Sequence, residues 1–353
     1  VDNSLKNKVD KVNGKGLSTV DFTKSYETKL KKLENYNDAT IKKDINDINA
    51  QLGDIVNINY EMFGAKGDGI TDDFESIKKA HNYANENNLS IKCNSKAKYL
   101  IKKLNRDFIE VKTNVDFNNC NFIIDDREID LTNCTIPIFK VVNKINNIVD
   151  ITGSLNSLYT DSRYIDALSN YDDVLLFVEN SNIKHFIRSG VNEDSGYNQQ
   201  EVIRVIRGRI ISDILWNYET ITKAIIYINE NEKTYFKNGR FTTIVNKLPN
   251  VYGDGVERGV IIERSNTIVD NIIHLLDGED TTQSKPYNGC LKIKNCCDVK
   301  LNNSTLTAHK VFKDENNINM GTYDFNLTYC TNIELNNVNQ SNSLTDDTKW
   351  GVE

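Results

Sequence analysis

The sequence predicts an all-β fold in which the chain coils into a solenoid of β-strands. Three observations predict it: a unit of alternating apolar residues that recurs at a near-constant period, a Gly- and Asp-rich turn that opens an amphipathic helix, and abundant asparagine, often in pairs. Asn tolerates left-handed backbone conformations, and its amide bonds to the next coil, which suits the turns of a β-solenoid. The 353 residues suffice for two or three domains and a large core.

The recurring unit consists of an apolar alternation, a polar turn with Asn or Asp, and a second apolar alternation. Four of the five intervals between its anchors fall between 31 and 35 residues. A fixed period of this kind means that each coil buries its inward residues on its neighbours. A β-sandwich with long loops is the alternative. The anchors are Val115, Ile148, Ile183, Ile268, Val299 and Ile333.

The fifth interval spans 85 residues, and we expect it to hold further coils. The candidates are residues 204–211 and 224–229, with residues 235–241 as a hairpin-like turn. Upstream of the first anchor, residues 91–93 and 98–101 are strand-like and fit a first rung.

The most specific local signal is the segment from Phe63 to Ile77, where a Gly- and Asp-rich turn runs into a helical pattern. Gly64, Gly67 and Gly69 permit backbone conformations that are closed to other residues. Thr71 is the expected N-cap of the helix, and acidic residues follow in the first turn, where the helix dipole favours them.

This segment resembles the entry motif of the pectate-lyase-like superfamily, written F-G-A-x-G-D-G-x-T-D-D. The resemblance implies a right-handed, single-stranded parallel β-helix whose open end is capped by the helix, and it implies that these aspartates are structural. Residues 339–351 resemble a Q-x-N-x-x-T-D-x-T-x-W-G segment of tailspike-like members of that superfamily, in which further rungs follow. We therefore expect the β-helix to be truncated at its C-terminus.

Two other patterns precede the entry motif. Residues 1–36 are polar and Lys-rich, and part of this stretch resembles a segment of baseplate and tail proteins of phages of Gram-positive bacteria. The resemblance implies a baseplate-attachment segment, with a flexible linker as the alternative. Residues 37–58 contain apolar residues spaced by 4, 3, 4 and 3, which is the heptad pattern of a coiled coil over about two heptads. Ile at the core positions favours a trimeric coiled coil. We expect a short trimeric coiled-coil stalk there, or else an amphipathic helix packed on its own domain, followed by the β-helix over residues 59–353.

Composition narrows the classes of partner. The formal net charge of −7 argues against a nucleic-acid backbone as the main ligand. No run of 18 apolar residues occurs, so we expect no transmembrane span. The seven cysteines are irregularly spaced and include no CxxC pair, which predicts buried free thiols and neither a metal site nor a cofactor.

Two groups of carboxylates are the candidates for catalysis. A β-helix enzyme that acts on a polysaccharide needs convergent carboxylates, roughly 5–10 Å apart in a glycosidase. Asp254 and Glu257 lie in one Gly-rich loop, and Asp277, Glu279 and Asp280 lie in a later one. Neighbouring loops of a solenoid stack on one side, so the two groups can meet; solvated turn residues are the alternative.

Aromatic residues in the strands and loops are the candidates for glycan binding, because their rings can stack on sugar rings. Packing in the core or between subunits is the alternative. The candidates are Tyr197, Trp216, Tyr218 and Tyr252.

Together, the resemblances imply a tail spike or tail fibre of a phage or phage-tail-like particle. Such a protein is a homotrimer that is attached to the baseplate through its N-terminus and binds a host cell-surface glycan, acting extracellularly at the host surface. Three copies would gain avidity without any new contact. A polysaccharide lyase or glycoside hydrolase on the same β-helix is one alternative, and a structural baseplate connector is another.

Overall fold

The computed structural model describes residues 57–102, 107–185, 187, 196–249, 255–278, 284–307 and 323–340. The expected attachment segment and all but the last two residues of the expected stalk lie outside the described residues, as does most of the closing segment.

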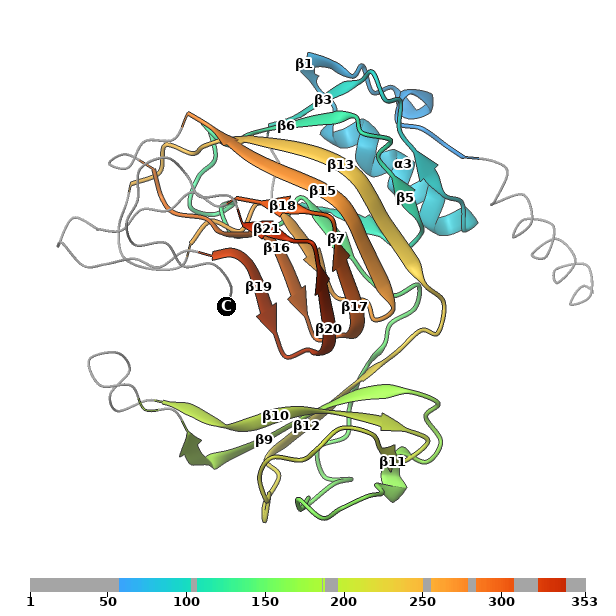
Figure 1. Ribbon diagram of the computed structural model, residues 1–353, viewed down its shortest axis with the longest axis vertical. Coiled ribbons are helices and arrows are strands. Elements are labelled where there is room, and N and C mark those ends of the chain that lie inside the picture. The colour runs from blue at the N-terminus through green and yellow to red at the C-terminus, as the bar shows by residue number, and fades with distance from the viewer. Residues whose placement is uncertain are drawn as a thin grey trace, which may run out of the picture. The chain divides into compact units, whose positions relative to one another are not determined.

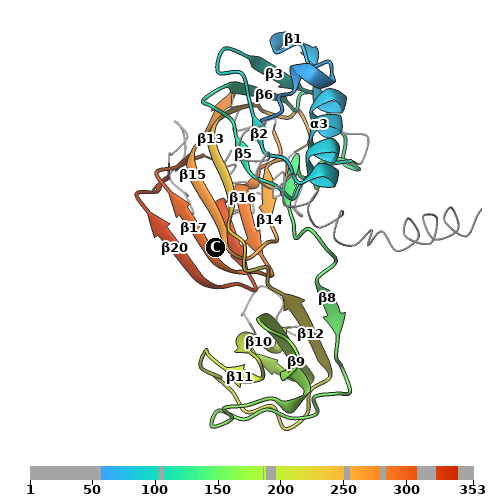
Figure 2. The ribbon, with the colours of Figure 1, turned by 90° about the vertical axis from the view of Figure 1, so that its right-hand side faces the viewer.

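Two parallel sheets form the body of the fold, which confirms the predicted parallel β-helix (Figures 1 and 2). Sheet A contains β1 (Asp68–Asp72), β2 (Ile91–Lys92), β3 (Lys98–Ile101), β5 (Val115–Asp116), β6 (Asn121–Asp125), β13 (Thr234–Ile244), β15 (Thr267–Asp277), β17 (Cys297–Asn302), β18 (Thr305–Leu306), β20 (Thr331–Asn336) and β21 (Asn339–Gln340). Sheet B contains β4 (Ile109–Val111), β7 (Phe139–Val141), β14 (Val260–Ile262), β16 (Asn288–Lys294) and β19 (Tyr323–Thr328).

The chain alternates between the two sheets, passing from β14 to β15, β16, β17 and β19 in turn. One row of paired positions in sheet A gives the period. Its consecutive members are 121, 33, 32 and 34 residues apart, so three of the four intervals match the predicted period and one is far too long. The row consists of Val115, Phe236, Val269, Leu301 and Leu335.

An asparagine ladder marks the bend of sheet A in successive rungs. Asn238, Asn271, Asn303 and Asn337 all have left-handed backbones, with φ between +48° and +60°. Asn271 Nδ2 donates to Asn238 Oδ1 over 2.9 Å, and Asn337 Nδ2 donates to Asn303 Oδ1 over 3.0 Å. The stacking predicted for asparagine in the turns of the solenoid is therefore confirmed.

The aspartates of the entry motif hold the turn together. Asp73 accepts the backbone N–H groups of Lys66 and Gly67 over 2.6 and 3.1 Å, and Asp68 accepts the backbone N–H and the hydroxyl of Thr71, each over 2.8 Å. Asp73 is buried, and burial raises the pKa of its carboxyl although the two N–H groups oppose that shift. The predicted structural role of these aspartates is confirmed.

The predicted N-cap is wrong by two residues. A short 3-10 helix, η2 (Glu61–Phe63), precedes the turn, and α3 (Phe74–Asn87) begins after Asp73 because Thr71 belongs to β1. Apolar side chains of α3, including Phe74 and Ile77, belong to the same buried core as the sheets. The helix therefore packs its apolar face on the first rungs (Figure 2). No helix in the described ranges is long and apolar enough to cross a membrane.

An inserted antiparallel sheet explains the long interval. Between β7 and β13 the chain leaves the β-helix and forms a five-stranded sheet C with a hydrophobic core of its own. Its elements are β8 (Ile148–Asp150), η3 (Asp166–Leu168), β9 (Val174–His185), β10 (Tyr197–Ile206), β11 (Arg209–Ile210) and β12 (Lys223–Ile228).

Three expectations about this stretch are wrong. Residues 204–211 and 224–229 belong to the antiparallel strands of sheet C and form no rungs, and the anchors Ile148 and Ile183 lie in β8 and β9. Residues 235–241 make no hairpin but run through the long parallel strand β13. A half-buried antiparallel strand shows the same alternation as a rung, so periodicity alone does not separate the two.

The insertion replaces a short turn. In the later rungs, only a few residues connect sheet B to sheet A, 263–266 after β14 and 295–296 after β16. The entry and exit of the insertion lie together, since Asn143 Nδ2 donates to the carbonyl of Ile228 over 2.8 Å. The β-helix thus continues beyond the insertion, where β13 pairs with β6 and β14 pairs with β7 in parallel without a register shift.

The cysteines behave as predicted in the described part of the chain. All seven are free, and six of them are buried, with Cys330 half-buried. They act as small apolar residues in the core.

Candidate functional site

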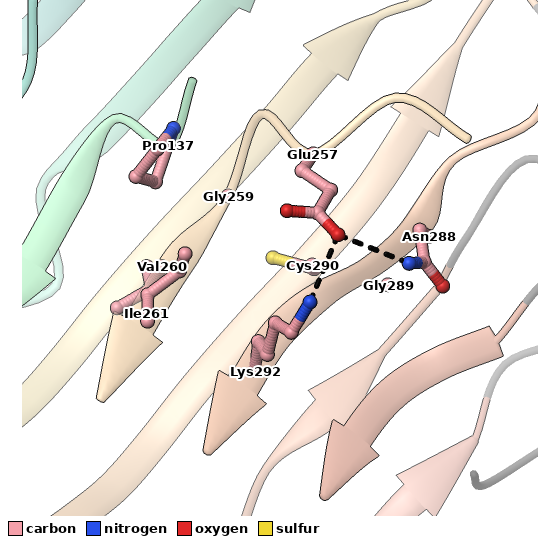
Figure 3. A pocket seen from close by; sticks show the side chains of 9 residues that line it. All are labelled: Pro137, Glu257, Gly259, Val260, Ile261, Asn288, Gly289, Cys290 and Lys292. Atoms are coloured by element: carbon pink, nitrogen blue, oxygen red, sulfur yellow. Dashed lines mark hydrogen bonds and ion pairs between the residues drawn. The ribbon is translucent and has the colours of Figure 1, made fainter. Parts of the chain in front are cut away.

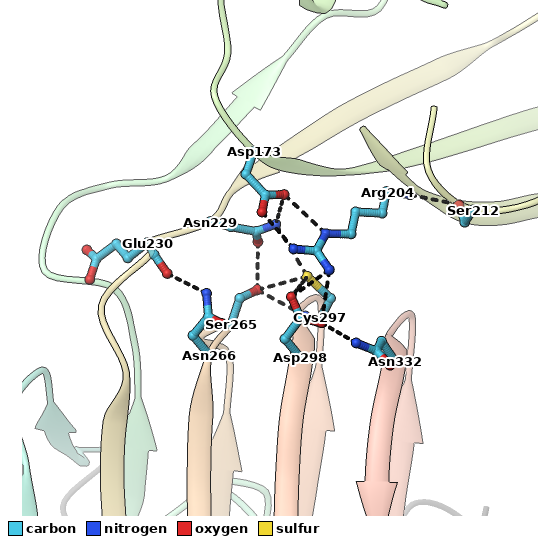
Figure 4. Close-up of polar contacts among 10 residues, drawn as sticks. All are labelled: Asp173, Arg204, Ser212, Asn229, Glu230, Ser265, Asn266, Cys297, Asp298 and Asn332. Carbon is cyan, nitrogen blue, oxygen red and sulfur yellow. Dashed lines mark hydrogen bonds and ion pairs between the residues drawn. The ribbon is translucent and has the colours of Figure 1, made fainter. Parts of the chain in front are cut away.

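Polar contacts join sheet C to the turns of the later rungs, and Arg204 of β10 is at their centre (Figure 4). Its guanidinium donates to both oxygens of Asp173 over 2.8 and 3.3 Å, and to Asp298 of β17 over 2.9 Å. The three side chains are largely buried. Forked guanidinium–carboxylate pairs fix geometry as well as charge, so Arg204 orients the insertion against the rung that carries Asp298.

A second chain of hydrogen bonds runs beside this ion pair. Asn229 Nδ2 donates to Asp173 over 2.8 Å, and the Ser265 hydroxyl donates to Asn229 Oδ1 over 2.6 Å. The same hydroxyl oxygen accepts the backbone N–H of Cys297 over 3.0 Å. The contact thus extends over two rungs of the β-helix (Figure 4).

A cleft of about 650 Å³ lies between sheet C and the last described rungs. Its size falls in the range of small-molecule sites. It is lined on the side of the insertion by Gln200, Glu201, Val202, Ser212, Asp213, Leu215 and Trp216, and on the side of the rungs by Leu327, Tyr329, Cys330, Thr331, Asn332 and Ile333.

Two aromatic rings supply flat surface in the cleft. Trp216 packs edge-to-face on His185, with ring centroids 4.8 Å apart. Tyr329 packs edge-to-face on Phe177 at 5.2 Å, and its hydroxyl accepts a hydrogen bond from Gln200 Nε2 over 3.1 Å. Each ring is therefore held by a neighbour before any ligand binds.

Glu201 positions the loop that carries Trp216. Its carboxylate accepts the backbone N–H groups of Leu215 and Trp216 over 3.0 and 3.4 Å. Burial raises the pKa of this carboxyl, and the two N–H groups act in the opposite direction. Because both carboxylate oxygens accept these bonds, Glu201 fixes the backbone of the loop that carries Trp216.

The four aromatic residues predicted to bind glycan differ in their exposure and in their position relative to the cleft. Trp216 lines the cleft, and Tyr197 lies opposite His185 in the β9–β10 pair with 57% of its surface exposed. The prediction for Tyr218 needs correction, because its side chain is fully buried in the core of the insertion and presents no face to a sugar. Tyr252 lies outside the described residues.

Of the five carboxylates predicted to be catalytic, Glu257 and Asp277 lie within the described residues. Glu257 precedes β14 of sheet B and accepts hydrogen bonds from two residues of β16, from Lys292 Nζ over 2.9 Å and from Asn288 Nδ2 over 3.1 Å (Figure 3). The hollow beside it holds about 10 Å³, which is room for one water molecule and too little for a sugar. Asp277 is exposed at the end of β15, where it pairs in register with Ile244. Asp254, Glu279 and Asp280 lie outside the described residues.

A buried ion pair adjoins Glu257. Arg258 donates to Asp126 over 2.9 Å, and the Tyr287 hydroxyl donates to the other oxygen of Asp126 over 2.9 Å. Arg258 and Asp126 are both inaccessible to water, so this group ties the two sheets together instead of facing a ligand. Within the described ranges, no group of three or more His, Cys, Asp or Glu side chains is placed to hold a metal ion.

Sequence reasoning missed most of the cleft. Gln200 of β10 is 129 residues from Tyr329, and no sequence pattern connects β10 to the turn that holds Tyr329 and Asn332. The Tyr329 position had one signal, since it follows a strand at the turn of a predicted rung, where side chains of successive rungs stack.

No protein-family model and no curated protein sequence matches the chain. Among solved structures, the chain is similar to the tailspike gp61 of Pseudomonas phage phi297, with a TM-score of 0.43 and 10% identity over 77% of this chain and 51% of that one. It is also similar to the Gp54 tailspike of Acinetobacter baumannii bacteriophage AP22, solved in complex with a capsular saccharide, with a TM-score of 0.32 and 12% identity over 80% of this chain and 59% of that one. The surface adhesin PfbA of Streptococcus pneumoniae gives a TM-score of 0.27 and 14% identity over 78% and 56%.

The chain spans between half and three fifths of the length of these three structures. The function has to be argued from the chain's own residues.

Proposed function

We propose that this protein is a receptor-binding spike or fibre of a phage tail, or of a phage-tail-like particle, that binds a host cell-surface glycan in the cleft beside Trp216. One observation carries the proposal. The cleft combines two fixed aromatic rings, Trp216 and Tyr329, with the side-chain amides of Gln200 and Asn332. Sugar rings present an apolar face and a rim of hydroxyls, so stacking surface and amide groups are what a glycan site requires.

The cleft is preorganised for binding. Tyr329 is held by Phe177 and Gln200, and the Trp216 loop is held by Glu201. Binding therefore orders few side chains, which keeps the entropic cost of association low.

The same proposal includes assembly and location. Residues 37–58 form a trimeric stalk and residues 1–36 attach it to the baseplate, so that three clefts reach the host surface outside the cell. Trivalent display multiplies a modest affinity for each cleft. The attachment segment and all but the last two residues of the stalk lie outside the described residues, and the heptad pattern in the sequence is what supports the trimer.

The experiment is a binding titration of the purified chain with cell-wall and capsular glycans of candidate hosts. Trp216→Ala should weaken binding at least about tenfold, which corresponds to ~1.4 kcal/mol of lost stacking. Tyr159→Ala is the matched control, because Tyr159 is an exposed aromatic residue of the insertion that does not line the cleft. Equal binding by both variants would refute the proposed site.

The same incubations separate the alternatives. New reducing or unsaturated ends that disappear in Glu257→Ala or Asp277→Ala would identify a depolymerase. Absence of both binding and cleavage would favour a structural baseplate connector.

A further inference from the structure

The charged residues that line the described part of the cleft are all of one sign. Glu201 and Asp213 are its charged residues, and none of the described lining residues is Lys or Arg. A carboxylated or phosphorylated sugar would meet no counter-ion among these described residues, and it would approach Asp213 at the cost of like-charge repulsion.

The nearest guanidinium is already engaged. Arg204 follows the lining residue Val202 on the same face of β10, but each of its three guanidinium nitrogens already donates to Asp173 or Asp298. Recruiting Arg204 to an anionic ligand would leave two largely buried carboxylates without their partner. The contact of Arg204 with Asp173 and Asp298 therefore also keeps this guanidinium from binding a ligand in the cleft.

Apolar side chains form much of the remaining wall, with Val202 and Leu215 on one side and Leu327, Cys330 and Ile333 on the other. A plain hexose has little apolar surface beyond its ring face, and that face stacks on the aromatic rings. An acetamido group adds a methyl group, and the transfer of this methyl from water to the apolar wall is favourable.

The amides of the cleft complement an acetamido group as well. Gln200 uses Nε2 as a donor to Tyr329, and Asn332 uses Nδ2 as a donor to Asp298. Within the described ranges, Gln200 Oε1 and Asn332 Oδ1 accept no hydrogen bond, so either oxygen can accept the single acetamido N–H. The second hydrogen on Gln200 Nε2 can donate to the acetyl oxygen.

We propose that the cleft selects a neutral glycan that contains an N-acetylated hexosamine and rejects acidic glycans. This inference rests on the proposed glycan-binding function and names the class of sugar for the same cleft. Selection comes from the rings, the apolar wall and the amide oxygens on the attractive side, and from Asp213 on the repulsive side.

Calorimetric titration of the full chain with three probes tests it: an N-acetylglucosamine tetramer, a glucose tetramer and a galacturonic acid tetramer. The expected result is binding of the first at least about tenfold tighter than the second, with no measurable binding of the third. Asp213→Lys should bring binding of the acidic probe into the measurable range. Asp161→Lys, the same change of charge at an exposed position outside the cleft, should leave binding of the acidic probe unmeasurable.

The outcomes separate this inference from the function on which it rests. Equal or tighter binding of the galacturonic acid tetramer by the wild-type chain would overturn the selectivity and leave glycan binding intact. Equal binding of both neutral probes would overturn the role of the acetamido group. If the chain binds none of the three probes and none of the host glycans, the glycan-binding function itself fails, and the selectivity fails with it.

Discussion

Arg204 of the inserted sheet binds Asp298 of the β-helix over 2.9 Å, across 94 residues of sequence. The same guanidinium holds Asp173 within the insertion, so one side chain joins two carboxylates from different parts of the fold. The candidate cleft borders this junction, since Asn332 lines the cleft and also bonds to Asp298. The position of the insertion and the shape of the cleft therefore depend on the same contact.

Replacing Arg204 with alanine should destabilise the protein and weaken glycan binding. Two carboxylates would lose their partner in a largely buried setting, and we expect a loss of about 1–3 kcal/mol in the free energy of unfolding. Urea denaturation measures it. Arg207→Ala is the control, because the Arg207–Asp172 pair is exposed and contributes little. Equal effects of the two substitutions would contradict the role given to Arg204.

Removing the insertion should leave a folded β-helix that no longer binds glycan. Replacing residues 144–230 with Asn-Gly joins ends that already lie together, as the bond from Asn143 to Ile228 shows. Circular dichroism should report a β-rich protein with one cooperative thermal transition. An unfolded product would mean that the later rungs depend on the insertion.

Acid should destabilise the fold through two buried histidines. Burial lowers the pKa of His81 to about 3 and that of His274 to about 4. Below about pH 6.5, these histidines are protonated in the unfolded chain but remain neutral in the folded chain. The stability that the neutral histidines contribute is therefore fully present above about pH 6.5 and is lost as the pH falls toward the pKa values of the folded chain. Each histidine contributes a loss of about 1.4 kcal/mol per pH unit in that window.

His81→Phe tests the origin of this acid sensitivity. The difference in unfolding free energy between pH 7.5 and pH 5 should shrink by about 2 kcal/mol, because the titrating group is gone while a ring still fills the site. His185→Phe, at a half-exposed histidine, controls for the loss of a histidine as such. An unchanged difference in His81→Phe would rule out His81 as a source.

Gly259→Ala should be strongly destabilising. A Cβ at this position would lie 1.9 Å from the carbonyl oxygen of Cys290 on the adjacent rung, so the backbone of sheet B would have to move. We expect a loss of more than about 2 kcal/mol in urea denaturation. Gly153→Ala is the control: its φ of +94° costs conformational energy, but nothing lies within 4 Å of the added carbon. A loss at Gly259 no larger than at Gly153 would show that the two rungs have room to adjust.

Part of this account could be predicted from sequence because solenoids repeat. The period and the abundant asparagines predicted the rungs, and the resemblance of residues 63–77 to a known entry motif implied the structural use of Asp68 and Asp73. The insertion was missed because β9 and β10 alternate as rungs do, and pairing direction leaves no mark on that pattern. The contact between Arg204 and Asp298, and the burial of Tyr218, depend on tertiary packing that a sequence pattern does not encode.

The most direct test of the central claim uses tryptophan emission. The chain has two tryptophans, Trp216 and Trp350, and the variant Trp350→Phe leaves Trp216 as the single reporter inside the cleft. Titration with a host glycan that binds in calorimetry should change the Trp216 emission saturably, with the same affinity as the calorimetric titration. Calorimetric binding without any change in Trp216 emission would place the glycan elsewhere and contradict the account.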